Sequence, residues 1–218
     1  MASTVVRPSL PSPPPDLTPG YLAHRGLREE LARLAVATRE VNPADIRQVQ
    51  AVEEHLALVL RFLAAHHREE DTVVYPRVRA RLRAPVPGRV FSDLEGDHDS
   101  LDTLTRRAAD VRVPLRERAP AVGRLHDLVA RHTYQEERDL FPLMRRHVSN
   151  REHGRLVRRT LRGWGRDLPV FISLYLHHAD PVEQIRLLRF APPGAGVMWR
   201  LAWRRQYARR RAAAYGTT

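Results

Sequence analysis

The sequence predicts an all-α protein whose main part is an antiparallel four-helix bundle. Apolar residues recur at the three- and four-residue spacing of helices, and no run of alternating residues indicates a strand. Helix-start and helix-stop signals divide this pattern into four main helices joined by short connections, which favours antiparallel neighbours. The residues that follow the bundle predict an appended C-terminal helical subdomain.

The composition excludes several classes of protein. The chain has 218 residues, with 11 histidines and no cysteine, so it cannot form a disulfide framework, a thiolate zinc site or an iron–sulfur cluster. Its 37 basic residues outnumber 25 acidic ones, for a net charge of +12, and all of them are arginine. A basic excess usually indicates an anionic partner. Because lysine is absent, we attribute the excess to codon bias and predict no specific nucleic-acid partner.

Residues 1–17 are predicted to form a disordered arm. This segment is rich in proline and poor in charge, so it cannot bury enough apolar surface to offset the entropy of ordering it. It lacks the continuous apolar stretch of a signal peptide, and no later stretch is long enough to span a membrane. We therefore expect a cytoplasmic protein. Its oligomeric state cannot be read from the sequence.

The bundle is expected to span residues 18–148. Its first helix has Thr18 as the N-cap, with proline at the first helical position, and ends before Asn42. Asn42, which is also followed by proline, is expected to cap the second helix. Apolar residues at helical spacing carry that helix toward Tyr75 and the proline after it.

The third and fourth helices complete the predicted bundle. Ser92 and Glu95 have the spacing of a capping box, which predicts a helix over about residues 93–110. The fourth helix is expected to begin near Arg118 and to end a little beyond Phe141, which is followed by proline.

Residues 149–218 are expected to form the C-terminal extension. Ser149 opens a short helix as part of a second capping box, residues 168–176 form an apolar helix, and Asp180 starts another. The last segment, residues 197–215, mixes tryptophan and tyrosine with arginine. It could anchor to a membrane surface, form a dimer face or pack over the bundle. Packing is favoured because aromatic residues at helical spacing usually belong to a core, with the arginines on a solvated face.

A motif that occurs twice in the chain contains the candidate metal-binding residues. The segments that begin at His66 and His132 each place a glutamate four residues after the histidine, then another acidic residue, then an aromatic–proline pair at the same offset. Each is preceded by a helix with a histidine near its start. Residues four apart share a helix face, so their side chains can converge on one ion. The candidate ligands are His24, His66, Glu70, His98, His132 and Glu136.

This donor set indicates a pair of metal ions. Four histidines and two carboxylates are too many ligands for one tetrahedral zinc, and no thiolate is present to favour zinc. They suit two first-row metals bridged by the carboxylates, and iron is favoured. The predicted cofactor is therefore two iron ions with an oxo or hydroxo bridge. One position on six-coordinate iron then remains open, which implies reactivity.

With this pattern the chain resembles the hemerythrin-like family, the HHE cation-binding domain, over about residues 18–148. The resemblance implies a four-helix bundle with a non-haem di-iron centre that meets O2, NO or peroxide. Invertebrate hemerythrin has a further histidine where this chain has Asp102, which argues against simple reversible oxygen carriage. The resemblance assigns one iron to His24 and His66 and the other to His98 and His132, with Glu70 and Glu136 as bridges.

Two further residues are candidates for an additional ligand or for a contact that supports one. Asp102 lies one turn after His98. His67 directly follows His66 and points about 100° away around the helix, which favours a supporting or exposed position. Pairing His67 with Asp71 gives an alternative register that does not match the second repeat. The other histidines are assigned to core, gate or surface positions: His55, His126, His147, His153, His177 and His178.

The residues one turn from the candidate ligands are nearly all apolar, which favours a dry pocket for a diatomic molecule or a hydrophobic substrate. We therefore predict a non-haem di-iron protein that binds or reacts with O2, NO or peroxide. One alternative is a di-iron oxidase or oxygenase that acts on a small metabolite. Another is an iron- or oxygen-responsive regulatory protein whose basic tail binds an acidic partner. No phosphate loop or nucleophile elbow identifies an organic substrate.

Overall fold

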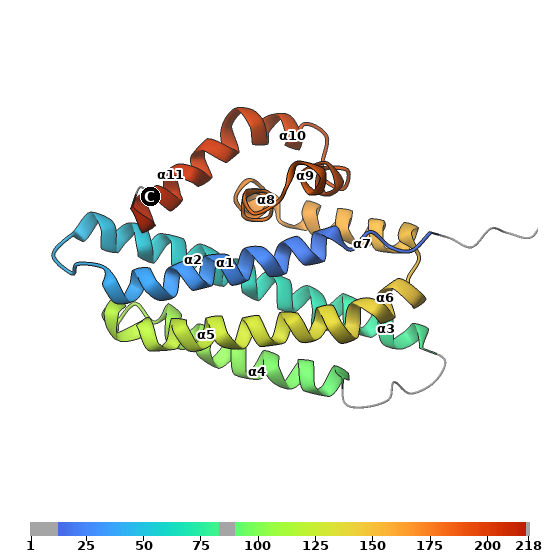
Figure 1. Cartoon of the computed structure of the whole chain (residues 1–218), viewed down its shortest axis with the longest axis horizontal. Coiled ribbons are helices and arrows are strands. Elements are labelled where there is room, and N and C mark those ends of the chain that lie inside the picture. The colour runs from blue at the N-terminus through green and yellow to red at the C-terminus, as the bar shows by residue number, and fades with distance from the viewer. Residues whose placement is uncertain (1–12, 83–89, 217–218) are drawn as a thin grey trace, which may run out of the picture.

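The computed structural model describes residues 13–82 and 90–216 of the chain. Within these two ranges every regular element is a helix and no strand occurs, as Figure 1 shows. The all-α prediction is confirmed. Most of the predicted N-terminal arm, residues 1–12, lies outside the described residues. No helix in the described ranges combines the length and the apolar character needed to cross a membrane.

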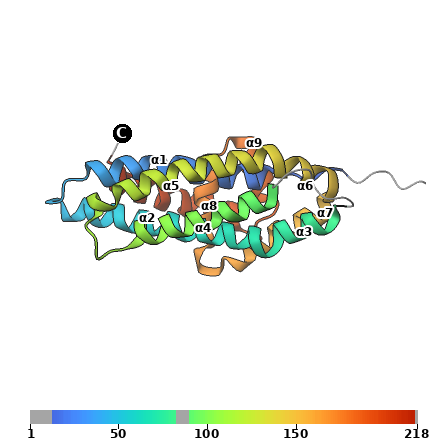
Figure 2. The ribbon, with the colours of Figure 1, turned by 90° about the horizontal axis from the view of Figure 1, so that it is seen from below.

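Long helices form an antiparallel bundle, in which each helix reverses the direction of the one before it (Figures 1 and 2). The first and the third long helix each pack against both the second and the fourth, so the four enclose a core. The second and the fourth continue into short helices at one end of the bundle. The elements are α1 (Thr18–Glu40), α2 (Ile46–Glu69), α3 (Tyr75–Arg81), α4 (Val90–Ala109), α5 (Leu115–Gln135) and α6 (Phe141–His147).

The start of α2 differs from the prediction. Its N-cap is Asp45, whose carboxylate accepts the backbone N–H of Gln48 at 3.0 Å. Asn42, the predicted cap, instead accepts the N–H of Ala44 at 3.0 Å and forms a tight turn before the helix. Both side chains are good acceptors for a free N–H. Asp45 is the cap because it lies three residues before an N–H that has no partner within the helix.

Three other predicted starts also differ from the structure. Thr18, the predicted cap of the first helix, already belongs to α1, and Leu17 holds the N-cap position. The chain is already helical at Val90, so Ser92 lies inside α4 and is not its cap. Phe91 is buried against the ring of Tyr75, with ring centroids 5.9 Å apart, and this packing favours a helix that begins upstream of Ser92. The fourth helix begins at Leu115, before the predicted start near Arg118.

The C-terminal helices lie along the face of the bundle that α1 and α2 form (Figure 1). The predicted caps at Ser149 and Asp180 are present, since each side chain accepts the N–H of the residue three positions later. Trp199 and Tyr207 are buried, so the aromatic last segment packs over the bundle. The elements are α7 (Asn150–Gly163), α8 (Leu168–His177), α9 (Pro181–Leu188), α10 (Ala195–Met198) and α11 (Arg204–Tyr215).

A glycine sets the close approach of α8 to α1. A Cβ atom built on Gly26 would lie 2.4 Å from Leu174 Cδ2 and 3.3 Å from the Leu174 carbonyl oxygen. We expect Gly26→Ala to lower the free energy of unfolding by about 1–3 kcal/mol, because the added methyl must push α8 away. Chemical denaturation measures this change. The control is Gly123→Ala in α5. There an added Cβ would have no atom of the described residues within 4 Å besides those of its own stretch of helix, so an alanine should be neutral or stabilising. Equal effects of the two substitutions would contradict the prediction.

Hydrogen bonds to one buried carboxylate connect the last helix to the bundle. Glu30 of α1 is fully buried, and its carboxylate accepts hydrogen bonds from His55, His178, Arg211 and Tyr215 at 2.8–2.9 Å. His55 comes from α2, whereas the other three come from the end of α8 and from α11. We predicted that the arginines of the last segment form a solvated face. Arg211 departs from that prediction because a buried carboxylate needs charged and hydrogen-bonding partners.

The apolar core is split in two by a polar layer. One apolar cluster fills most of the bundle and continues into α8 and α11, and the other lies at the end where α3 and α6 meet. On α1, for example, buried His24 lies between Leu17 of the small cluster and Leu27 of the large one. The candidate ligands occupy the corresponding position on the other three long helices. Buried polar groups such as those of this layer normally have hydrogen-bond partners or bind a ligand.

Candidate metal centre

Both helices that carry the repeated motif widen into a π-helical turn at the motif's glutamate. The turns are η1 (Glu70–Val74) and η2 (Glu136–Leu140), and in each the aromatic N–H bonds the glutamate carbonyl five residues earlier. Proline, which follows each aromatic residue, has no N–H and clashes with the carbonyl four residues before it. A wider turn relieves that clash. The aromatic–proline pair at the same offset was the signal for it, and π-turns are frequent at functional sites.

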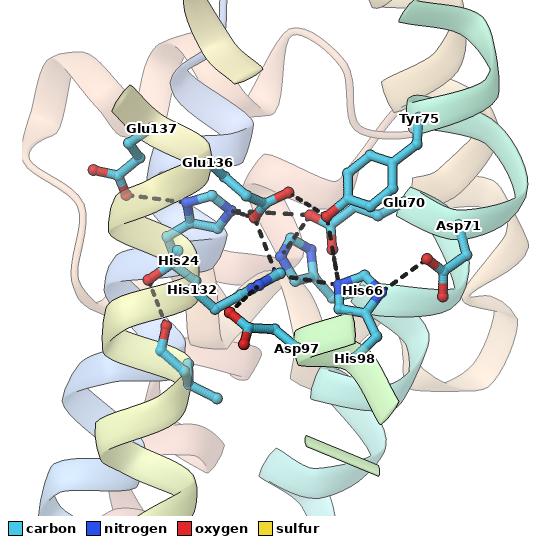
Figure 3. A network of polar contacts seen from close by, with 12 residues as sticks. His24, His66, Glu70, Asp71, Tyr75, Asp97, His98, His132, Glu136 and Glu137 are labelled. Carbon is cyan, nitrogen blue, oxygen red and sulfur yellow. Dashed lines mark hydrogen bonds and ion pairs between the residues drawn. The ribbon is translucent and has the colours of Figure 1, made fainter. Parts of the chain in front are cut away.

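The structure brings all six predicted ligands together from the four long helices and their continuations (Figure 3). Glu70 places Oε1 3.0 Å from His66 Nε2 and Oε2 3.7 Å from His98 Nε2. Glu136 Oε2 lies 3.3 Å from His24 Nε2 and 3.6 Å from His132 Nε2. Each carboxylate therefore lies between a histidine of one half and a histidine of the other. This is the arrangement that a bridging ligand requires.

The ligand atoms form two groups, and in each group all atoms lie within 4.8 Å of one another. Glu70 belongs to both groups, which again fits a bridging position. The groups are His24, His66, Glu70 and Glu136, and His67, Glu70, His98 and His132.

His67 belongs to the second group, where the sequence favoured a supporting or exposed position. It is 4% exposed, and its ring stacks on that of His98 with centroids 4.3 Å apart. His67 reaches a different group from His66 because successive residues of a helix point about 100° apart. His66 and His67 lie on either side of Glu70, so they face the two different ligand groups. The structure thus offers a histidine from α2 beside His98.

Neither Asp102 nor Asp71 lies in the position considered for it from the sequence, Asp102 as a further ligand and Asp71 as the partner of His67. Asp102 is exposed on α4, one turn beyond His98, and belongs to neither group. Asp71 is not paired with His67, because its carboxylate accepts the Nδ1–H of His98 at 2.8 Å.

The acidic residue after each glutamate supports a histidine of the other half. Asp71 bonds His98, and Glu137 bonds His24 Nδ1 at 3.0 Å while also accepting a hydrogen bond from Arg28 at 2.8 Å. A carboxylate that accepts the Nδ1–H holds the ring orientation and leaves Nε2 free for a metal. Sequence reasoning missed this role, although the identical position of the acidic residue in both repeats was a signal for it.

Tyr75 brings a hydroxyl group into the same layer. We predicted a core position for its ring, and the ring is fully buried, but its hydroxyl donates to Glu136 Oε1 at 2.8 Å. It also lies 3.4 Å from His98 Nε2. Burial and the nearby carboxylates of Glu70 and Glu136 raise the pKa of Tyr75, so the phenol stays protonated and acts as a donor.

Burial also keeps two of the imidazoles neutral. It lowers the pKa of His66 to about 3, with the charges of neighbouring histidines acting in the same direction as the burial. Burial lowers the pKa of His67 well below its usual value for the same reasons. A neutral imidazole has the lone pair that a metal requires.

The pKa values of the Glu70 and Glu136 carboxylates shift in opposite directions. Burial and the charge of Glu136 raise the pKa of Glu70. Burial acts on Glu136 too, but the close approach of His24 Nε2, 3.3 Å from Glu136 Oε2, and the charge of that imidazole outweigh it and lower the pKa of Glu136 to about 2. Two buried carboxylates at one place repel each other when both are ionised. A bound cation would let both ionise.

Buried polar atoms without a hydrogen bond gather in this layer. Among the described residues, no hydrogen-bond partner is present for Nε2 of His24, His66 and His67 or for Oε2 of Glu70 and Glu136. In addition, His98 Nε2 and His132 Nε2 face each other at 3.1 Å. Buried polar atoms normally have partners. Imidazole nitrogens and carboxylate oxygens are ligands for first-row metals, so the donor set fits the implied pair of ions.

Comparison with known proteins gives one positive result. A family model described as the hemerythrin HHE cation binding domain matches residues 21–144. That range contains all six predicted ligands and His67. Comparisons with curated proteins and with solved structures gave no match.

Proposed function

Because the chain belongs to the hemerythrin HHE cation-binding domain family, we propose that it is a non-haem di-iron protein that binds or reacts with O2, NO or peroxide. The observation that carries the proposal is the pair of buried ligand groups that share Glu70. Iron in both positions would supply redox chemistry and a site for a small oxygen- or nitrogen-containing molecule. Imidazole and carboxylate ligands without any thiolate favour iron in this environment.

We assign His24 and His66 to one metal position and His67, His98 and His132 to the other. Glu70 and Glu136, each of which lies near histidines of both positions, are assigned as the bridging ligands. The second position thus takes its third histidine from α2. In this assignment Asp71 and Glu137 hold the rings of His98 and His24, and Tyr75 fixes the orientation of the Glu136 carboxylate through its hydroxyl. The six ligands predicted from the sequence have side chains that are at most 12% exposed, and His67 is 4% exposed, so the two metal positions are buried.

The apolar clusters on both sides of the layer exclude bulk water from it. Exclusion of water strengthens the interaction of the carboxylates with a cation and limits loss of a bound small molecule to solvent. The neutral phenol of Tyr75 is a proton donor that contacts one of the two bridging carboxylates, that of Glu136.

The function is tested by reducing the iron-loaded protein without air and then adding a pulse of O2, with spectra recorded over time. A spectral change that reverses when O2 is removed supports binding. Rapid irreversible oxidation without an added substrate supports reaction with O2. A protein that takes up no iron, or whose spectrum does not respond to O2, NO or peroxide, would overturn the proposal.

The assignment of His67 gives a separate prediction. We expect His67→Ala to weaken metal binding at the second position by more than about 10-fold, because even partners that only support a ligand contribute 10- to 100-fold. Metal content per chain after equilibrium dialysis measures this loss. His126→Ala, which removes a histidine that lies outside both groups, is the control. Two metals bound with unchanged affinity in His67→Ala would show that His67 is not a ligand.

A second function, oxidation of a small organic molecule, has one observation in its favour. An apolar cavity is lined in part by His24, His66 and Glu70 of the first metal position. Consumption of O2 that depends on an added organic substrate would select this function over simple binding.

A further inference from the structure

The cavity beside the ligand layer lies between the bundle and the C-terminal helices and has a volume of about 110 Å³. His24, His66 and Glu70 belong to its bundle wall. The opposite wall comes from α7 and the residue that follows it, from α8 and from α9, all of which follow the end of the family match at residue 144. That wall includes His153, Leu156, Val157, Leu161, Trp164 and Tyr175. The cavity is therefore a product of this chain's extension and not of the bundle alone.

Aromatic packing shapes the wall that the extension supplies. The ring of Phe62, one turn before His66, packs edge-to-face against Trp164 and Tyr175, with centroids 6.1 and 5.3 Å apart. Leu161 is 2% exposed and adds an aliphatic surface to the same wall. Packed aromatic rings have a defined geometry and a large apolar area. The space beside the first metal position is thus preformed and mostly apolar.

The extension wall includes a buried histidine, His153, that can bond a ligand. His153 is 5% exposed, and its Nδ1 has no hydrogen-bond partner among the described residues. Burial lowers the pKa of His153 to about 4, so its imidazole is neutral and can donate or accept a hydrogen bond. In contrast, the hydroxyl of Thr160 already donates to Glu69 at 2.9 Å, across the edge of the cavity.

We propose that this cavity binds a small, predominantly apolar organic molecule whose single polar group meets His153 and whose remainder lies against the aromatic wall. An engineered apolar cavity of about 150 Å³ binds benzene or xenon. The present cavity is smaller, so it suits a molecule smaller than benzene. An anionic molecule is disfavoured, because it would meet the carboxylates of Glu69 and Glu70 and lose its hydration against the apolar part of the lining. Any reaction of this molecule would rest on the proposed di-iron function. Its binding in the cavity requires no metal.

Binding is tested with crystals of the full chain soaked separately in xenon, propan-1-ol and sodium propionate. We expect density for xenon and for propan-1-ol in the cavity, with the alcohol oxygen within hydrogen-bond distance of His153. We expect none for propionate. Empty cavities in both the xenon and the alcohol soaks, or propionate bound as well as propan-1-ol, would overturn the proposal.

A variant pair tests whether the extension defines the site. Val157→Phe should fill the cavity and abolish xenon density, whereas Arg162→Phe adds the same ring to an exposed position of α7 and should leave xenon bound. Xenon retained in Val157→Phe would contradict the assignment. The soaks of the unmodified chain do not depend on the folding of either variant.

The same soaks with and without iron separate this inference from the proposed function. Probe molecules bound in a chain that takes up no iron would overturn the di-iron function and leave the cavity proposal intact. Iron bound at both positions beside a cavity that takes no probe would do the reverse.

Discussion

Glu136→Ala is expected to abolish the signal of a paired metal centre and to weaken metal binding by more than about 100-fold. The carboxylate of Glu136 lies within 3.6 Å of His24 and His132, one histidine from each ligand group. Its loss removes one of the two charges that balance the cations and leaves the Tyr75 hydroxyl without its acceptor. Glu70→Ala should have the same effect, since Glu70 belongs to both groups.

Metal content per chain, together with the absorption and Mössbauer spectra of the iron-loaded protein, measures this loss. Glu54→Ala is the matched control, because Glu54 is exposed on α2 and lies far along the helix from the ligand layer. Circular dichroism shows whether each variant remains helical. A full complement of two irons with an unchanged paired signal in Glu136→Ala would refute the bridging assignment.

Glu30→Ala is expected to lower the free energy of unfolding by about 3–5 kcal/mol, because it removes a fully buried carboxylate and leaves the Arg211 side chain, which is only 13% exposed, without its counter-charge. Four hydrogen bonds to the Glu30 carboxylate are lost with it, three of them from the end of α8 and from α11. The C-terminal helix should therefore detach more readily from the bundle. Denaturation measures the stability, and limited trypsin digestion within residues 204–211 measures the detachment.

The neighbouring residue supplies the control for this substitution. Glu29 is exposed on the same helix, so Glu29→Ala should change stability little. If Glu30→Ala and Glu29→Ala unfold at the same denaturant concentration and are digested at the same rate, the buried network does not hold α11 in place.

The contribution of Glu30 should also depend on pH. Burial alone would raise the pKa of Glu30, but hydrogen bonds from His178 and His55 and the charge of Arg211 outweigh it and hold the pKa well below its usual range. A carboxylate with a lowered pKa stabilises the fold above its unfolded pKa of about 4.3, and this stabilisation is lost as the pH falls below that value. The stability difference between the unmodified chain and Glu30→Gln should thus be largest near neutral pH and shrink below about pH 4. A difference that stays constant down to pH 3 would contradict this account.

Most of the fold, and the six candidate ligands that the structure brings together, could be predicted because their signals are local. Helical periodicity and proline positions depend on residues within a few turns of one another. The spacing of His66 and Glu70, repeated at His132 and Glu136, defines a shared helix face without any knowledge of the neighbouring helices. Exact helix starts were less predictable, since Asn42 and Asp45 are both good caps and only packing distinguishes them.

The position of His67 could not be predicted for a different reason. Its direction, about 100° from His66, was correct, but a residue that points away from one metal can point toward another. Whether it does depends on where α4 places His98, whose ring stacks on that of His67. The π-turns at Glu70 and Glu136 likewise follow from how the backbone accommodates the aromatic–proline pairs within the packed bundle.

By itself, the sequence determined the helices, their antiparallel order and the set of candidate metal ligands. Only the tertiary structure decided which carboxylate supports which histidine, as with Glu137 and His24, which are 113 residues apart. It also decided that Tyr215 bonds Glu30 across 185 residues and that the extension encloses a cavity beside His66. The physical reason is that periodicity is a property of one helix. Contacts between helices depend on how several faces pack together, and no short stretch of sequence specifies that packing.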